Sequence, residues 1–127
     1  MIYGIGVDIV DVNRFGKIIE KHGNKFAKRV LAKTEYSTYM QSFTDKPTYL
    51  SKCWAVKEAF VKAMGTGFTG TFNKKDIAYS STGYTRPYLV LSNSAELEVI
   101  KLNIKTNLSV SDERSNAVAF VVLERTL

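Results

Sequence analysis

Glu58 and Lys62 are the pair of side chains with the clearest chemical potential, because a carboxylate and an ammonium lie four residues apart. Four apolar residues around them recur at the spacing of one helix face: Val56, Ala59, Phe60 and Ala63. This spacing predicts a buried helix from Trp54 onward, with the two charges beside its apolar stripe, where they could flank a cleft. They also fit an exposed helix pair, since Glu four residues before Lys is the favoured order and contributes about 0.3 kcal/mol.

Asp8 is a second candidate, because the local pattern gives it no structural role. The first predicted strand alternates apolar residues with small or polar ones: Tyr3, Ile5, Val7 and Ile9 against Gly4, Gly6 and Asp8. This alternation predicts one aliphatic face and one nearly bare face. Asp11 fits the cap of the next helix better, since apolar residues resume at helical spacing after it and Gly23 closes that helix. The glycines leave space beside the Asp8 carboxylate that something other than side chains could occupy.

Shorter elements are predicted around the central helix, which Gly65-Thr66-Gly67 ends with residues that tolerate a left-handed backbone. A short helix is expected from Glu35 to Gln41, capped by Thr34, and a loop from Ser42 to Lys46 leads into the central helix. The expected later elements are a strand at Ile77 and Tyr79, a turn from Ser80 to Thr85, a strand from Tyr88 to Leu91, a helix from Ser94 to Lys101, and a closing hairpin with strands at 105–111 and 117–124.

The composition is that of an ordinary globular protein. Of its 127 residues, 45% are hydrophobic and 24% charged, and no apolar run is long enough for a membrane span. We expect a cytoplasmic protein with no membrane partner. Cys53 is the single cysteine, which rules out an intrachain disulfide, and His22, the single histidine, suits an exposed or capping role better than a catalytic one.

The net charge of +6 favours an acidic partner or a phosphate-rich ligand. A small basic nucleic-acid-binding module is therefore an alternative function. That alternative leaves Asp8 and Glu58 unexplained, because carboxylates facing a phosphate groove oppose binding unless a metal intervenes. We favour a function without a nucleic-acid partner.

Three motifs, in order, resemble the 4'-phosphopantetheinyl transferase superfamily, most closely its holo-[acyl-carrier-protein] synthase group. They are Gly4-Ile-Gly-Val-Asp8-Ile-Val-Asp-x-x-Arg14, the stretch from Trp54 to Gly67, and Ser109-Val-Ser-Asp-Glu-Arg114 followed by Ala117-Val-Ala119. Agreement in identity and order makes the resemblance more specific than any one motif. The resemblance implies an α+β fold, with a small antiparallel sheet packed against one long central helix and shorter helices. We expect residues 1–127 to form a single domain of this kind.

The resemblance implies transfer of the 4'-phosphopantetheine group from coenzyme A to a serine of apo acyl carrier protein, releasing adenosine 3',5'-bisphosphate and supporting fatty acid biosynthesis. Attack on a pyrophosphate builds charge on oxygen, so the site needs a divalent metal and a nearby cation. In the family, the aspartate matched by Asp8 binds the metal. Asp8 and Glu58 would supply oxygen ligands suited to Mg²⁺, and Lys62 the cation. A metal-bound water, or Glu58 through a water, could take the serine proton.

The resemblance implies coenzyme A binding at the end of the central helix and at Arg86-Pro87-Tyr88, which resembles the family's element beside the nucleotide end of coenzyme A. The residues are Lys62, Gly65, Thr66, Gly67 and Pro87. Many relatives have histidine where this chain has Asp112. Because a carboxylate would repel a phosphate, we assign Asp112 no role in binding coenzyme A and expect it to serve a turn or a subunit contact.

The basic run from Arg14 to Lys33 ordinarily indicates a solvated face. In the family this region docks the acidic recognition helix of the carrier protein, which implies carrier-binding roles for Arg14, Lys21, Lys25 and Arg29. The resemblance also implies a homotrimer with active sites at the subunit interfaces. Each site would combine Asp8, Glu58 and Lys62 of one subunit with surface of the next, including its hairpin near 109–114.

Overall fold

The computed structural model describes residues 1–41, 44–81 and 86–126. Its elements are β1 (Ile2–Asp11), α1 (Val12–His22), α2 (Lys25–Val30), α3 (Lys33–Tyr39), α4 (Lys46–Met64), the 3-10 turn η1 (Lys74–Asp76), β2 (Ile77–Ser80), β3 (Tyr88–Leu91), α5 (Asn93–Lys101), β4 (Ile104–Glu113) and β5 (Asn116–Arg125). The predicted α+β class and the closing hairpin are confirmed. The turn expected at residues 80–85 falls largely outside the described residues.

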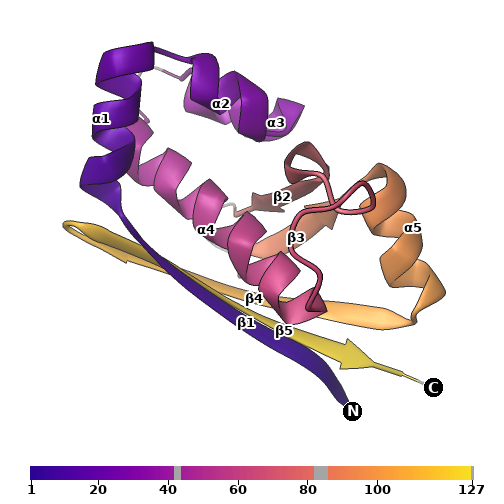
Figure 1. Cartoon of the computed structure of the whole chain (residues 1–127). Coiled ribbons are helices and arrows are strands. Elements are labelled where there is room, and N and C mark those ends of the chain that lie inside the picture. The colour runs from indigo at the N-terminus through magenta and orange to yellow at the C-terminus, as the bar shows by residue number, and fades with distance from the viewer. Residues whose placement is uncertain (42–43, 82–85, 127) are drawn as a thin grey trace.

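The strands form two antiparallel sheets, one with the order β1-β5-β4 and one made of β2 and β3. Figure 1 shows α4 running along one face of the three-stranded sheet, with α1 to α3 and the β2-β3 pair on the other side of the helix. The central helix is therefore enclosed between two layers.

Helix α4 begins and ends at residues with clear local reasons. The Asp45 carboxylate accepts a hydrogen bond from the Thr48 N–H at 3.3 Å, and Pro47 lies in the first turn, where its missing N–H costs nothing. Gly65 closes the helix with a φ of 77°, in the left-handed region that glycine tolerates. The predicted end of the central helix is confirmed.

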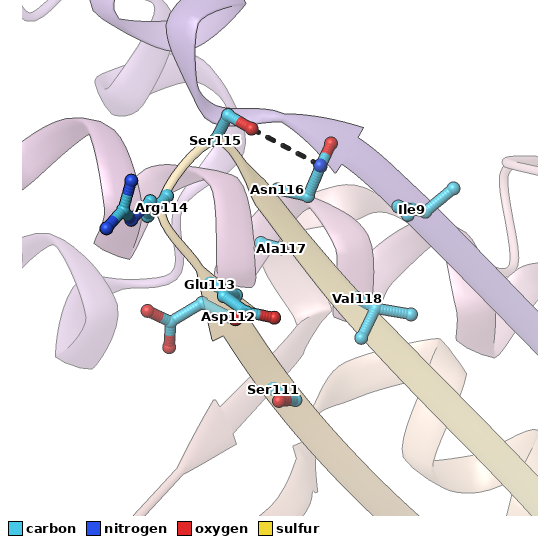
Figure 2. Close-up of a pocket in the computed structure, with 9 residues that line it drawn as sticks. All are labelled: Ile9, Ser111, Asp112, Glu113, Arg114, Ser115, Asn116, Ala117 and Val118. Atoms are coloured by element: carbon cyan, nitrogen blue, oxygen red, sulfur yellow. Dashed lines mark hydrogen bonds between the residues drawn. The ribbon is translucent and has the colours of Figure 1, made fainter.

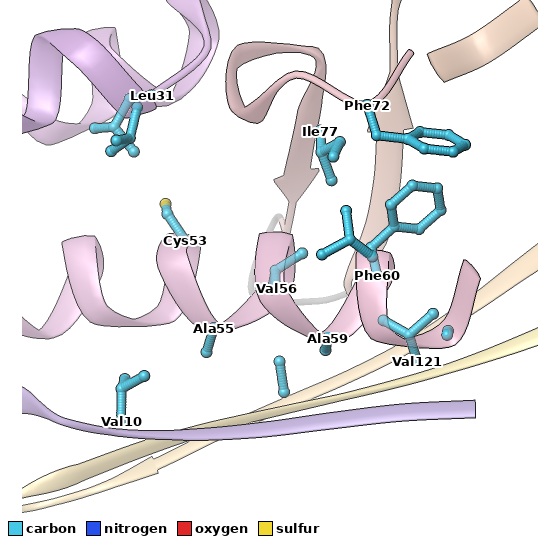
Figure 3. Packing of buried hydrophobic residues seen from close by; sticks show 14 of the residues in the cluster. Val10, Leu31, Cys53, Ala55, Val56, Ala59, Phe60, Phe72, Ile77 and Val121 are labelled. Atoms are coloured by element: carbon cyan, nitrogen blue, oxygen red, sulfur yellow. The ribbon is translucent and has the colours of Figure 1, made fainter. Parts of the chain in front are cut away.

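The predicted apolar stripe of α4 is buried, and the helix is also buried on other sides. Figure 3 shows Val10, Ala55 and Ala59 between α4 and the three-stranded sheet. On the opposite side of α4 the same view shows Cys53 and Ile77. Helix α4 is therefore packed on two sides, against the three-stranded sheet and against the second layer.

The bare face of β1 packs directly against the backbone of α4. A Cβ added at Gly4 would collide with the Ala63 carbonyl oxygen, and one added at Gly6 with the Ala59 carbonyl oxygen. The gap that we expected to hold something other than side chains therefore holds the helix backbone. As a consequence, the aliphatic face of β1, carrying Ile5, points away from α4 and is exposed.

Several predicted boundaries were wrong by one or two residues. Helix α3 is capped at Ala32, whose N–H donates to the Glu35 carboxylate, so Thr34 lies inside the helix and does not cap it. Helix α5 has its N-cap at Ser92, because the chain turns into the helix at Asn93, before the predicted Ser94. The closing hairpin turns at 114–115, and its strands run closer to the turn than the sequence predicted.

Candidate active site

Asp8 and Lys62 meet where β1 crosses the C-terminal half of α4. The Lys62 ammonium donates to Asp8 Oδ1 at 2.9 Å and to the Val7 carbonyl oxygen at 3.1 Å. The Lys62 side chain is 51% exposed and that of Asp8 only 14%. The exposed Lys62 of α4 thus lies at the rim of the site, with its ammonium against β1, while the less exposed Asp8 lies at the floor of the site.

The second oxygen of Asp8 is buried and has no hydrogen-bond partner among the described residues. A buried carboxylate oxygen without a partner carries a desolvation cost of roughly 1–3 kcal/mol or more. Such an atom calls for a ligand, and a cation suits it best.

Glu58 lies one turn before Lys62 and is partly buried. Burial raises the pKa of its carboxyl above the ordinary value, and the negative charge of Asp8 raises this pKa further. Positive charges on Lys62, Lys74 and Arg14 lower the pKa in turn. Two carboxylates and several cations thus act on one another at this place, the usual setting of groups that do chemistry.

The donor set fits a hard divalent cation. Among the described residues, no group of three or more His, Cys, Asp or Glu side chains could hold a metal ion. Magnesium nevertheless uses only one or two carboxylates and keeps several waters. Asp8 offers an oxygen without a partner among the described residues, and Glu58 offers a carboxyl whose pKa is raised by burial and then by the charge of Asp8; a cation between the two would offset both costs.

The segment expected to bind coenzyme A follows Lys62 directly. Gly65, Thr66 and Gly67 are exposed, and both glycines have positive φ values, 77° and 67°. Pro87 comes just before β3, in the two-stranded sheet, and so lies outside the elements that carry Asp8, Glu58 and Lys62.

A hollow of about 450 Å³ lies between α2, Trp54 of α4 and the loop after α4. Its lining includes Arg29, Trp54 and Lys74. Trp54 is one turn before Glu58, and its ring lies between those of Phe26 and Phe68, at centroid distances of 5.6 and 5.9 Å. Basic and aromatic side chains therefore line this hollow together.

Sequence reasoning assigned no site role to Lys74 or Trp54. Lys74 stacks over the Phe68 ring at 4.4 Å and influences Glu58, although it lies 16 residues further along the chain, so no local pattern identifies it. The position of Trp54 could have been inferred from the sequence, since a residue four positions before Glu58 lies on the same face of the helix.

The four residues expected to bind a carrier lie on two successive helices. Arg14 and Lys21 belong to α1, and Lys25 and Arg29 belong to α2; all are exposed. The ion pairs found within the described residues involve none of these four. Arg14 also acts on Glu58, so this basic surface extends to the edge of the site.

Asp112 pairs with Lys52 of α4 at 3.2 Å. Its role within the chain is therefore an ion pair between the hairpin and the central helix. A hollow of about 440 Å³ lies at the tip of this hairpin. Figure 2 shows the residues that line it, Ile9 and residues 111–118. Ile9 belongs to the face of β1 opposite Asp8, so this hollow and the Asp8 site lie on different sides of the strand.

The chain belongs to the 4'-phosphopantetheinyl transferase superfamily, whose family model matches residues 4–121. It is 39% identical over 125 residues to a holo-[acyl-carrier-protein] synthase of Ruthia magnifica subsp. Calyptogena magnifica, covering 98% of each chain. The crystal structure of the holo-[acyl-carrier-protein] synthase from Neisseria meningitidis superposes with a TM-score of 0.91, at 36% identity, over 98% of this chain and all of that one.

The holo-[acyl-carrier-protein] synthase of Bacillus anthracis in complex with CoA (3',5'-ADP) superposes with a TM-score of 0.81, at 31% identity, over 99% of each chain. These similarities confirm the predicted family, its fold and the enzyme class, a phosphopantetheinyl transferase. Within the residues that the structure describes, no helix is long and apolar enough to cross a bilayer.

Proposed function

We propose that the protein transfers the 4'-phosphopantetheine group from coenzyme A to a serine of apo acyl carrier protein, in support of fatty acid biosynthesis. The carrying observation is the cluster at the β1–α4 crossing: the unpartnered oxygen of Asp8, the adjoining Glu58 and the ammonium of Lys62. Relatives that are holo-[acyl-carrier-protein] synthases support this substrate pair, as does the Bacillus anthracis structure in complex with CoA (3',5'-ADP).

In this reaction the serine oxygen forms a bond to the phosphorus that carries the pantetheine arm. The bond from that phosphorus to the bridging oxygen breaks, and adenosine 3',5'-bisphosphate leaves with the electron pair. The serine proton must go to a base. Glu58 is the proposed base, whose carboxylate takes this proton through a water.

Asp8 and Glu58 are proposed to hold one Mg²⁺. When bound, this ion supplies Lewis-acid stabilisation of the charge that develops on the phosphoryl oxygens. Lys62 adds a second positive charge. Because its side chain is half exposed, its ammonium can turn from Asp8 toward an anionic substrate without leaving a buried position.

The two substrates are proposed to approach from different sides of the cluster. Coenzyme A contacts Lys62, the exposed segment of Gly65, Thr66 and Gly67, and Pro87 at its nucleotide end. The carrier docks its acidic helix on the basic surface formed by Arg14, Lys21, Lys25 and Arg29. Arg29 of that surface also lines the hollow, and the charge of Arg14 acts on Glu58, which supports placing the serine of a docked carrier near the cluster.

A homotrimer with active sites between subunits completes the proposal, because the site of one chain is open and coenzyme A is long. The exposed aliphatic face of β1 supports self-association. We also propose that the chain acts as a single catalytic domain in the cytoplasm, where the free thiol of Cys53 stays reduced.

The direct test is mass spectrometry of apo acyl carrier protein incubated with the enzyme, coenzyme A and Mg²⁺. The expected result is a mass gain of one phosphopantetheine arm on the carrier serine, absent when the metal is chelated. A carrier variant with alanine at the accepting serine is the control. An unchanged carrier mass with folded enzyme, coenzyme A and Mg²⁺ present would contradict the proposed function, and retention of the protein on DNA at physiological salt would favour the nucleic-acid alternative.

A further inference from the structure

Glu35 and Lys57 form an ion pair that is closed off from solvent, on the side of α4 away from the three-stranded sheet. Their side chains are 1% and 0% exposed. The Lys57 ammonium donates to Glu35 Oε1 at 2.6 Å and to the Ile77 carbonyl oxygen at 2.5 Å. A buried ammonium with two acceptors at such distances has little freedom to move.

The Glu35 carboxylate also accepts from two backbone N–H groups. Oε1 accepts from Ala32 at 3.1 Å, and Oε2 accepts from Tyr79 at 3.3 Å. A single carboxylate therefore joins the N-terminus of α3, the middle of α4 and strand β2. These contacts come from segments 22 and 44 residues apart in the chain, so they fix tertiary arrangement rather than local structure.

The opposite side of α4 is fixed by β1. Gly4 and Gly6 allow the strand backbone to touch the carbonyl groups of Ala63 and Ala59. Lys57 is the residue before Glu58, and Lys62 lies one helical turn after Glu58. A rotation of α4 about its axis, or a slide along it, would move Glu58 and Lys62 together relative to Asp8.

Stability alone does not account for this pair. Replacing a buried ion pair with apolar side chains of similar size is often neutral or stabilising, because the charges lose their hydration. An apolar pair would lack directional bonds. Apolar packing permits small rotations of α4 that the hydrogen bonds to the Ile77 carbonyl and from the Tyr79 N–H prevent.

We propose that Glu35 and Lys57 are positioning residues, which set the rotation and height of α4 so that Glu58 and Lys62 meet Asp8. The inference rests on the proposed function only in taking these three as the reacting cluster. Lys57 touches no substrate; it acts through the helix that it anchors.

The experiment uses the double variant Glu35→Leu/Lys57→Met, which removes both charges and keeps the volume. The single variant Lys57→Met is the second probe. Val56→Ala is the matched control, because Val56 is the adjacent buried residue of α4 and its side chain has no polar bonds. For each protein, three quantities are measured: the urea midpoint of unfolding, the Kd for Mn²⁺ by electron paramagnetic resonance, and kcat and KM for each substrate.

The double variant is expected to unfold at a lower urea midpoint, as Val56→Ala does, because the Ala32 and Tyr79 N–H groups and the Ile77 carbonyl lose their partners. Unlike Val56→Ala, it should also bind Mn²⁺ about tenfold more weakly and lose roughly ten- to a hundredfold in kcat. Its KM for carrier should stay within about threefold of wild type, because the docking surface lies on α1 and α2. Val56→Ala should lower the urea midpoint and leave the Kd for Mn²⁺ and kcat nearly unchanged.

A folded double variant with wild-type Mn²⁺ affinity and kcat would overturn the proposal. If the double variant does not fold, the same readouts on Lys57→Met decide it, and failure of both variants to fold would assign the pair to folding instead. Wild-type protein that transfers no phosphopantetheine contradicts the proposed function separately, whatever the variants do.

Discussion

At the scale of single residues, the two carboxylate oxygens of Asp8 have different surroundings. One oxygen is paired with Lys62, and the other is buried with no partner within the described residues. A structural aspartate in such a place would bind backbone N–H groups, as Asp11 does with Asn13 at the start of α1. This contrast between two aspartates three residues apart supports the proposal that Asp8 holds a ligand.

Glu58→Ala should lower kcat by at least about a hundredfold, because one of the two proposed metal ligands and the proposed base disappear together. The melting temperature should change little, since Glu58 is only partly buried and its removal relieves repulsion with Asp8. Steady-state kinetics at saturating Mg²⁺ and a thermal melt check both parts. Wild-type turnover by Glu58→Ala in an assay that still depends on metal would show the ligand assignment to be wrong.

Lys62→Ala should have opposite effects on turnover and on metal affinity. Turnover should fall by roughly a hundredfold, because a charge that stabilises the developing phosphoryl anion is lost. Mn²⁺ should bind up to about fivefold more tightly, because Lys62 no longer competes for Asp8 Oδ1, and a half-exposed ion pair is worth up to about 1 kcal/mol. Isothermal titration gives the affinity without turnover. Weaker Mn²⁺ binding in this variant would contradict the competition.

At the scale of elements, the β1–α4 crossing depends on the missing side chain of Gly6. Gly6→Ala should destabilise the protein by about 1–3 kcal/mol, because the new Cβ collides with the Ala59 carbonyl oxygen. Gly16→Ala in α1 is the control: its Cβ would meet only Pro47, at 3.9 Å, so it should stabilise by about 0.5–1 kcal/mol. Urea unfolding of both variants measures the difference, and an unchanged midpoint for Gly6→Ala would refute the close packing.

Charge changes on the basic surface of α1 and α2 should alter KM for the carrier and not KM for coenzyme A. Arg14→Glu is expected to raise KM for the carrier about tenfold and to leave KM for coenzyme A nearly unchanged, and added salt should act in the same direction. Lys101→Glu makes the same change in net charge at the exposed end of α5 and should alter neither constant. Equal increases in both Michaelis constants for Arg14→Glu would place it outside the carrier surface.

Some elements and contacts could be predicted from the sequence, and others could not. The stripe of α4 is a periodic pattern, so this helix and its buried face could be predicted. The alternation of β1 predicted the strand and its two faces, but not which of them is buried. Asp8 could be chosen as a candidate site residue because the strand pattern gave it no structural role. The Glu35–Lys57 pair could not be found, since two charges 22 residues apart carry no periodic signal and a lysine on a helix usually faces solvent. The direction in which the aliphatic face of β1 points was likewise open, because it depends on which face α4 covers.

At the scale of the whole molecule, the three-stranded sheet separates two surfaces. One face carries α4 and, at its edge, the Asp8 cluster. The other carries the outward side chains of β1 and β5, and Ile5 is registered with Val122, Val7 with Phe120, and Ile9 with Val118. These pairs make one continuous apolar strip, and an exposed apolar strip of this kind usually marks an interface.

The strip is predicted to be the contact between copies of this chain. Ile5, Val7 and Ile9 are 60%, 52% and 67% exposed, so association would remove them from water at a gain of about 25 cal/mol per Å². A second copy is the fitting partner, because the strip lacks the charge that an acidic carrier or a phosphate ligand would require. The number of copies, three, comes from the family resemblance. Such an assembly would bring a neighbouring chain beside the open site.

Sedimentation equilibrium should therefore give a trimer, and Val7→Lys should give monomers with at least about tenfold lower kcat/KM, because a charge in the strip cannot be buried unpaired. Leu97→Glu is the matched control, since Leu97 is 68% exposed on α5, away from the strip, and should leave both mass and activity unchanged. If the site is shared, raising the concentration of Val7→Lys should restore trimer and activity in parallel. A fully active monomer at assay concentration would refute the shared site.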